Sequence, residues 1–122
     1  MNNKMTVYEI HLAICVETVD IWHNPRKVFQ LQYADVLDDY NQILEPHALN
    51  NTFPSEAEWK KVIDGLSFLL DQGLEIEAIV ERAKVLAAHP EYFDPELNQE
   101  QYNNYMKHWD KSCIEYHTKG KM

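Results

Sequence analysis

Glycine and proline are scarce in this sequence, with three and five residues among 122. Sandwiches and barrels need many tight turns, and glycine and proline are the residues that build them. Their scarcity therefore favours helices. The chain length fits one domain, expected over residues 1–122 with about 6–117 ordered and a frayed basic tail at 118–122.

Cysteines are also few, and Cys15 and Cys113 lie near opposite ends of the chain. A single pair at that separation is not the pattern of a small disulfide-stabilised domain, so a reducing, cytoplasmic location is expected. No uninterrupted run of about 18 apolar residues occurs, and no transmembrane helix is expected. Isolated glycines and a lack of glycine-rich loops exclude a P-loop or a Rossmann turn.

Positive charge is the third shortage, because 11 Lys and Arg stand against 20 Asp and Glu, for a net charge of −9. This balance argues against direct nucleic-acid binding, which requires a basic surface. From Val28 to Met106 there are four basic and fifteen acidic residues, while the last sixteen residues carry +2. The negative charge is therefore concentrated in the middle of the chain.

Apolar periodicity predicts an all-α bundle of about five helices, over residues 6–23, 25–45, 55–72, 74–89 and 95–117. Pro46 is expected to end the second helix, and Leu49 and Phe53 to pin the loop that follows. Ser55 and Glu58 have the spacing of a capping box, Gly73 is a left-handed stop, and Asp94 caps the last helix.

The first segment allows a second interpretation. Tyr8, Ile10, Leu12, Ile14 and Val16 alternate as they would in a strand. We favour a largely buried helix that includes Leu12, because eighteen residues is long for one strand and no partner strand follows. On that helix Thr6 and Glu9 fall on a narrow polar stripe.

Two cysteine–histidine pairs at helical i, i+4 spacing suggest a metal site. His11 with Cys15, and Cys113 with His117, could together hold one zinc ion between the first and last helices. The alternative is that the cysteines are buried thiols and His11 a core or subunit-contact histidine, because the close-spaced ligands typical of structural zinc sites are missing. We prefer this alternative and expect no metal and no other cofactor.

Acidic residues without nearby cations are the main functional signal. No Lys or Arg occurs from Val28 to Glu58, and acids again stand alone between Val62 and Glu81. Such a surface either keeps a small protein soluble or recognises a basic partner. Candidate contacts of this kind are Asp35, Asp38, Asp39, Glu45, Glu75 and Glu77.

The aromatic residues of the last helix form a narrow seam. Its members are Tyr102, Tyr105, Met106, Trp109, Cys113 and Tyr116. Packing against the first helix is the first interpretation, and partner binding or homodimer contact through Tyr102, Tyr105 and Trp109 is the other.

We therefore expect a non-catalytic, acidic binding or inhibitor protein whose partner is a basic protein, such as a nucleic-acid-processing enzyme or a toxin. Immunity proteins, nuclease inhibitors and DNA mimics share this size and charge. The alternatives are a homo-oligomeric assembly protein that uses the aromatic seam, and a small zinc-binding helical protein.

Overall fold

The described part of the chain is built from helices. The computed structural model describes the backbone of residues 4–23 and 30–120, and the side chains of residues 4–18 and 35–108. Over these ranges the α-helices are α1 (Val7–His23), α2 (Gln30–Asn50), α3 (Glu56–Asp71), α4 (Glu77–Ala88) and α5 (Pro95–Gly120), with a 3-10 helix η1 (Pro90–Tyr92). The predicted all-α class is confirmed.

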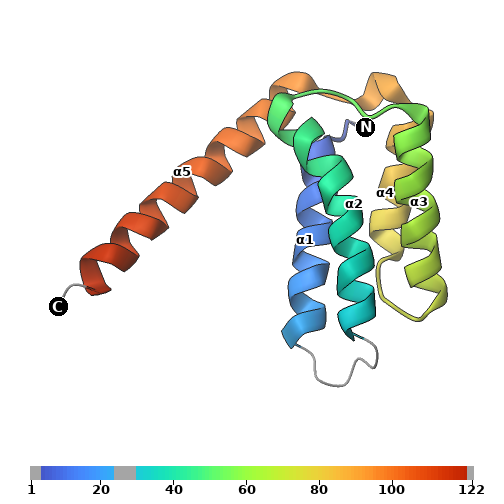
Figure 1. Cartoon of the computed structure of the whole chain (residues 1–122). Coiled ribbons are helices and arrows are strands. Elements are labelled where there is room, and N and C mark those ends of the chain that lie inside the picture. Colours follow the sequence, from blue (N-terminus) through green and yellow to red (C-terminus); the bar gives the residue numbers. More distant parts are fainter. Residues whose placement is uncertain (1–3, 24–29, 121–122) are drawn as a thin grey trace.

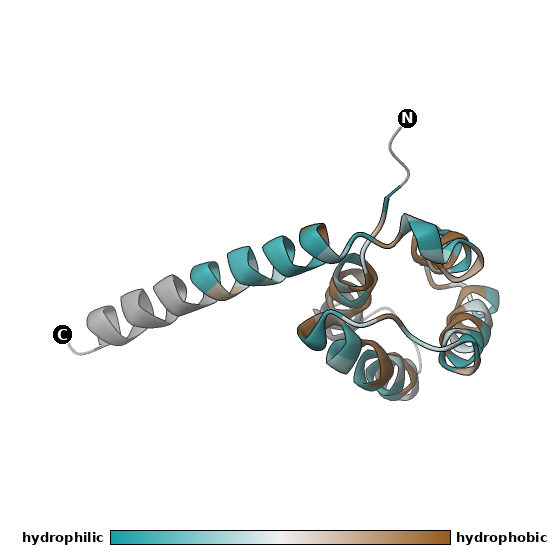
Figure 2. Ribbon diagram, turned by 90° about the horizontal axis from the view of Figure 1, so that it is seen from above, coloured by the Kyte–Doolittle hydropathy of each residue, from teal (hydrophilic) through white to brown (hydrophobic). Residues whose placement is uncertain are grey.

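The first four helices run alternately up and down and surround one core (Figure 1). Helix α1 packs beside α2, α2 beside α3, α3 beside α4, and α4 closes the ring against α1. Seen end-on, the four helices enclose a common axis while α5 extends to one side (Figure 2). The core is built from the apolar positions that recur at helical spacing, including Val7, Ile10, Ile14, Leu37, Leu44, Trp59, Val62, Leu66, Leu69, Val80, Ala83 and Leu86.

The first segment is helical, so the strand interpretation is wrong for α1. Thr6 caps the helix, because its hydroxyl oxygen accepts the backbone N–H of Glu9 at 3.0 Å. Two details differ from the sequence prediction: Thr6 is fully buried, and Leu12 is 40% exposed. The reason lies in α5, which covers the start of α1 and places Gln101 within hydrogen-bond distance of the Thr6 hydroxyl.

Helix α2 continues through Pro46 and ends at Asn50, so the predicted stop at Pro46 is wrong. Proline in a helix removes one N–H donor, and here both Pro46 and the residue four positions earlier, Gln42, are exposed, so water can satisfy the freed carbonyl. The actual end is a Schellman turn: Asn51 has a φ of 57° and the N–H of Thr52 bonds to the carbonyl of His47 at 3.0 Å.

The loop after α2 is anchored differently from the prediction. Phe53 packs against the core beside Trp59 and Phe93, as expected, with ring centroids 5.8 and 5.4 Å away. Leu49 is 41% exposed and is not an anchor. Because the helix continues past residue 46, Ala48 takes the buried position and Leu49 falls on the outer side.

Helices α3 and α4 pack side by side as an antiparallel hairpin (Figure 1). Ser55 and Glu58 make a reciprocal capping box, and Gly73 adopts a φ of 95° in the turn. Helix α4 begins at Glu77 rather than at residue 74. Leu74 and Ile76 lie in the turn before α4, and both side chains are buried. Their apolar character therefore reflects burial in a segment that is not helical.

The start of the chain is tied to the start of α5. Met5 pairs with Phe93 in an isolated parallel bridge, and its N–H bonds to the Tyr92 carbonyl at 2.9 Å. Asp94 caps α5 as predicted, accepting the N–H of Leu97 at 3.1 Å. From this base α5 leaves the bundle at an angle and runs to Gly120, beyond the predicted end at 117 (Figure 1). The predicted first turn of the second helix, from Pro25, lies outside the described residues.

Candidate functional site

Acidic side chains line the outer side of α2. Asp35, Asp38, Asp39 and Glu45, here called the α2 acidic stripe, are all exposed. The helix buries its other side through Leu37, Leu44 and Ala48. Because residues three, four and seven positions apart share one side of a helix, this burial pattern sets the four carboxylates facing outward together.

The ion pairs among the described side chains do not involve the α2 acidic stripe. Within the part of the chain whose side chains are described, none of its four carboxylates forms an ion pair. Its field reaches the neighbouring helix α1 and acts within α2 itself. After burial, Glu45 and Asp38 are the groups that raise the pKa of the Cys15 thiol on α1, and Asp39 contributes to the raised pKa of Tyr40.

Glu75 and Glu77 lie on a different element from the stripe. Both are exposed, Glu75 in the turn before α4 and Glu77 in the first turn of that helix. This turn lies at the end of the bundle where α2 begins (Figure 1). The six candidate acids therefore form a stripe along α2 and a separate pair at one end of the bundle.

Two residues of the aromatic seam of α5, Tyr102 and Tyr105, contact Tyr8 of α1. Tyr102 is partly buried and meets Tyr8 of α1 edge-on, with ring centroids 6.5 Å apart and planes at 71°. Tyr105 also contacts Tyr8 at 6.0 Å but remains 45% exposed. Burial, aided by the adjacent Tyr105 and Tyr102, raises the pKa of Tyr8. The side chain of Trp109 lies outside the described residues.

His11 and Cys15 form a neutral pair on the side of α1 that faces Asn41 and Glu45 of α2. The Cys15 Sγ lies 3.9 Å from Nδ1 and 3.8 Å from Nε2 of His11, so it is aligned with neither ring nitrogen. Burial lowers the pKa of His11 and raises that of Cys15. Both shifts favour the uncharged forms, whereas a reactive cysteine requires the thiolate.

Of the two cysteine–histidine pairs in the zinc hypothesis, the pair of His11 and Cys15 has described side chains. No group of three or more His, Cys, Asp or Glu residues suited to a metal ion occurs among the residues searched, which are the described ones. The side chains of Cys113 and His117 lie outside that part.

Asn98 is the polar residue that sequence reasoning missed. It is fully buried in α5, where its Oδ1 accepts the N–H of Tyr8 at 2.9 Å. Its Nδ2 donates to the Ala48 carbonyl at 3.0 Å and to Asn51 Oδ1 at 3.1 Å. Asn98 thus joins the start of α1, the end of α2 and the base of α5. Asn98 stands next to other polar residues in the sequence, so nothing in its surroundings indicated that its side chain is buried.

A second unpredicted contact joins α2 to α3. His47 lies 2.7 Å from the Thr52 hydroxyl through Nδ1 and 3.1 Å from the Glu58 carboxylate through Nε2. Glu58 also accepts the N–H of Ser55, and these bonds lower its pKa. Although hydroxyl, imidazole and carboxylate are connected here as in a hydrolase, Glu58 already serves the helix cap, so the arrangement links two helix ends.

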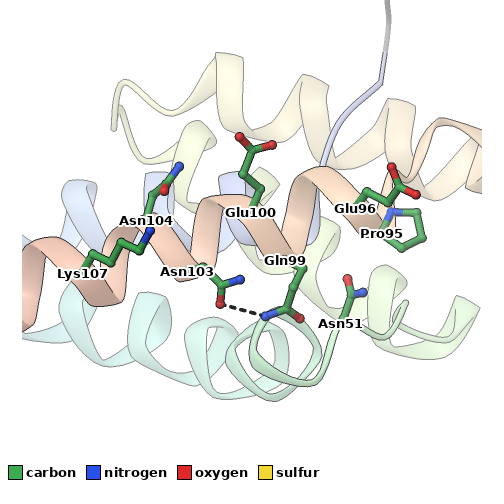
Figure 3. Close-up of a pocket in the computed structure, with 8 residues that line it drawn as sticks. All are labelled: Asn51, Pro95, Glu96, Gln99, Glu100, Asn103, Asn104 and Lys107. Atoms are coloured by element: carbon green, nitrogen blue, oxygen red, sulfur yellow. Dashed lines mark hydrogen bonds between the residues drawn. The ribbon is translucent and has the colours of Figure 1, made fainter.

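An open hollow of about 630 Å³ lies along the outer side of α5 near the end of α2. Figure 3 shows that its side chains come from successive turns of α5, with Asn51 contributed by the loop after α2. Gln99 donates to Asn103 across it at 3.1 Å. The lining is polar, with amides and the carboxylates of Glu96 and Glu100, and it holds no nucleophile paired with a base.

Of the described helices, none combines the length and the apolar character needed to cross a bilayer.

Comparison with known proteins adds no relative: no family model, no curated protein and no solved structure matches the chain. The functional assignment therefore rests on the residues and geometry described above.

Proposed function

We propose that this protein is a non-catalytic binding protein whose α2 acidic stripe occupies a basic surface of a partner protein. The supporting observation is the exposure of Asp35, Asp38, Asp39 and Glu45 on one side of one helix, without an ion pair among the described residues. The class of partner that fits is a protein with a cationic cleft, such as a nucleic-acid-processing enzyme or a toxin. The protein would then act as its inhibitor.

Like charges along a helix are unfavourable for the free protein. Same-sign pairs three or four residues apart, such as Asp35 with Asp38 or Asp39, destabilise an isolated helix by roughly 0.2–0.5 kcal/mol each. A basic partner removes that repulsion on binding. The same field speeds the encounter between the two proteins and disfavours acidic competitors.

Binding fits the described side chains better than catalysis does. The thiol and imidazole nearest to the stripe, Cys15 and His11, are held in their neutral forms. Solubility is the competing explanation of the acidity, since net charge alone keeps small proteins dispersed. The two explanations make different demands: partner binding depends on where the acidic residues lie, whereas solubility depends on the net charge alone.

Charge reversal separates the two explanations. The full chain and its Asp35→Lys/Asp38→Lys/Asp39→Lys variant would each be used as bait in an extract of the native host, with captured proteins identified by mass spectrometry. The matched control reverses three exposed acids on other helices, Asp71→Lys/Glu81→Lys/Glu100→Lys, and changes the net charge equally.

We expect the wild-type chain and the control to retain the same basic protein and the stripe variant to lose it. Equal capture by all three chains would remove the stripe from the interface. Equal loss from both variants would assign the effect to net charge and would support the solubility explanation.

A further inference from the structure

A hollow of about 360 Å³ opens where α1 meets α5, and we call it the tyrosine hollow. Tyr8, Glu9 and Leu12 of α1 line it together with Tyr105 and His108 of α5. Leu12 is 40% exposed and Tyr105 45% exposed. Single exposed apolar residues are ordinary on a protein surface, but these two border the same hollow. The hollow is therefore a place where a small molecule can cover apolar surface.

Two of the lining residues bring aromatic rings to the hollow. The ring centroids of Tyr8 and Tyr105 lie 6.0 Å apart, and the ring planes are inclined by 56°. Tyr102 meets the Tyr8 ring edge-on from the same helix as Tyr105, at 6.5 Å. The face of an aromatic ring attracts a cation that lies within about 6 Å of the ring centre. Two inclined rings offer this attraction from two directions.

The hydroxyl group of Tyr8 has no hydrogen-bond partner among the described residues, although the residue is only 7% exposed. A buried tyrosine usually satisfies its hydroxyl with a neighbouring polar group or with water. Because Tyr8 lines the hollow, its hydroxyl oxygen is available to accept a hydrogen bond from a molecule bound there. Burial raises the pKa of Tyr8, so at neutral pH the group is an uncharged phenol.

Glu9 supplies negative charge to the hollow. Its carboxylate accepts a hydrogen bond from Nε2 of Gln101 at 2.9 Å and lies 4.0 Å from Nη1 of Arg82 on α4. These contacts hold the carboxylate in place and leave some of its lone pairs free, because an ionised carboxyl group can accept about four hydrogen bonds. Neither lysine nor arginine is among the side chains that line the hollow.

We infer that the tyrosine hollow binds a small organic ammonium ion. The ammonium N–H groups donate to the Glu9 carboxylate and the Tyr8 hydroxyl, the rings of Tyr8 and Tyr105 attract the charge, and Leu12 contacts the carbon chain. The net charge of −9 favours a cation over an anion or a neutral molecule of the same size. The hollow lies on α1 and α5, and ammonium binding there is independent of the proposed role of the α2 acidic stripe.

The first test compares a cation with a neutral molecule of the same shape. The probes are 2-phenylethylammonium and 2-phenylethanol, which differ in whether an ammonium or a hydroxyl group ends the chain. Each is titrated into the full chain at about pH 8, where histidine is neutral, and the tyrosine ring signals are followed by NMR. We expect the ammonium ion to shift the signals of Tyr8 and Tyr105 and to bind about tenfold more tightly than the alcohol, because charged groups make the stronger hydrogen bonds. Equal affinities, or shifts confined to other tyrosines, would overturn the inference.

Variants of the two tyrosines test the individual contacts. Tyr8→Phe removes a hydroxyl that no described residue uses, so it should weaken ammonium binding by about two- to tenfold and leave urea unfolding unchanged. Tyr105→Leu keeps an apolar side chain but removes the ring, and we expect a loss of about two- to fivefold. Tyr105→Phe keeps the ring and should bind as the wild type does. Unchanged binding by Tyr8→Phe and Tyr105→Leu would show that the ion does not occupy the hollow.

A pair of acid variants separates the local charge from the net charge. Glu9→Gln keeps the shape of the side chain and should weaken ammonium binding by about tenfold. Glu100→Gln is the matched control, because Glu100 is an exposed acid of α5 that does not line the hollow, and the same charge is removed. Circular dichroism and urea unfolding check that both variants fold. Equal weakening by the two variants, or unchanged binding by Glu9→Gln, would overturn the inference.

Discussion

The phenol ring of Tyr40 lies directly against the backbone of Gly65, at the contact between α2 and α3. A Cβ atom at residue 65 would fall 1.8 Å from Cζ and 1.9 Å from Oη of Tyr40. The ring thus occupies the space that any other side chain at residue 65 would require. A glycine inside a helix, otherwise unfavourable, is what lets these helices approach.

Gly65→Ala is expected to lower the free energy of unfolding by up to about 2 kcal/mol. Alanine improves helix propensity by about 1 kcal/mol, but overpacking costs about 1–3 kcal/mol because the half-buried Tyr40 ring must move outward. Urea unfolding measures the change. In a Tyr40→Ala background the obstruction is gone, so the same substitution should become stabilising; destabilisation of equal size there would contradict this account.

Asn98→Ala should destabilise the protein by about 2–4 kcal/mol, because it leaves the buried N–H of Tyr8 and the carbonyl of Ala48 without their partner. Asn103→Ala is the control on the same helix, since Asn103 is exposed and bonds only to Gln99 among the described residues. Its unfolding should be unchanged. Similar midpoints for the two variants would show that Asn98 is not the junction described.

Pro46→Ala is expected to stabilise the protein by about 2–2.6 kcal/mol. Proline inside a helix costs about 3 kcal/mol relative to alanine, and its restriction of the unfolded chain returns about 0.4–1 kcal/mol. Because Pro46 is exposed, its removal creates no cavity. Thermal and urea unfolding give the result, and a lower midpoint would indicate that a bend at this residue supports the packing of Ala48.

Stability should fall as the pH drops below the ordinary histidine pKa of 6.5, because burial lowers the pKa of folded His11. Above that value His11 is neutral in both states and contributes no pH dependence. Below it, the unfolded chain binds the proton more readily, so the free energy of unfolding decreases by at most about 1.4 kcal/mol per pH unit.

The measurement is urea unfolding between about pH 7.5 and about pH 5.5, above the range in which carboxylates titrate. Glu45 and Asn41 of α2 face His11 and raise its pKa, but they offset only part of the lowering caused by burial. His11→Gln should flatten the profile over this range. A profile that keeps the wild-type slope in this variant would assign the pH dependence to another group.

The bundle itself was predictable because local signals and burial agree there. The Ser55 and Glu58 capping box, the Gly73 turn and the apolar faces of α3 and α4 follow from spacing alone. The sequence prediction was wrong where a tertiary contact overrode a local signal. Pro46 indicated a helix end, yet Ala48 and Asn51 are held by Asn98 from fifty residues away, and α2 continues.

The candidate site was predictable in part. The α2 acidic stripe follows from the burial of Leu37, Leu44 and Ala48 on the opposite side of the same helix. The separation of Glu75 and Glu77 from that stripe depends on which helices adjoin, which no short-range spacing encodes. The exposure of Leu12 was not predictable, because it depends on the direction in which α5 leaves the bundle.

The attachment of the first helix to the last one has a consequence for synthesis. Thr6 and Tyr8 find their hydrogen-bond partners in Gln101 and Asn98, 95 and 90 residues later in the chain. During translation, the first turn of α1 therefore lacks these hydrogen-bond partners until synthesis has passed Gln101. Contacts that distant in sequence form late in folding, so the four-helix ring assembles before its N-terminus is secured.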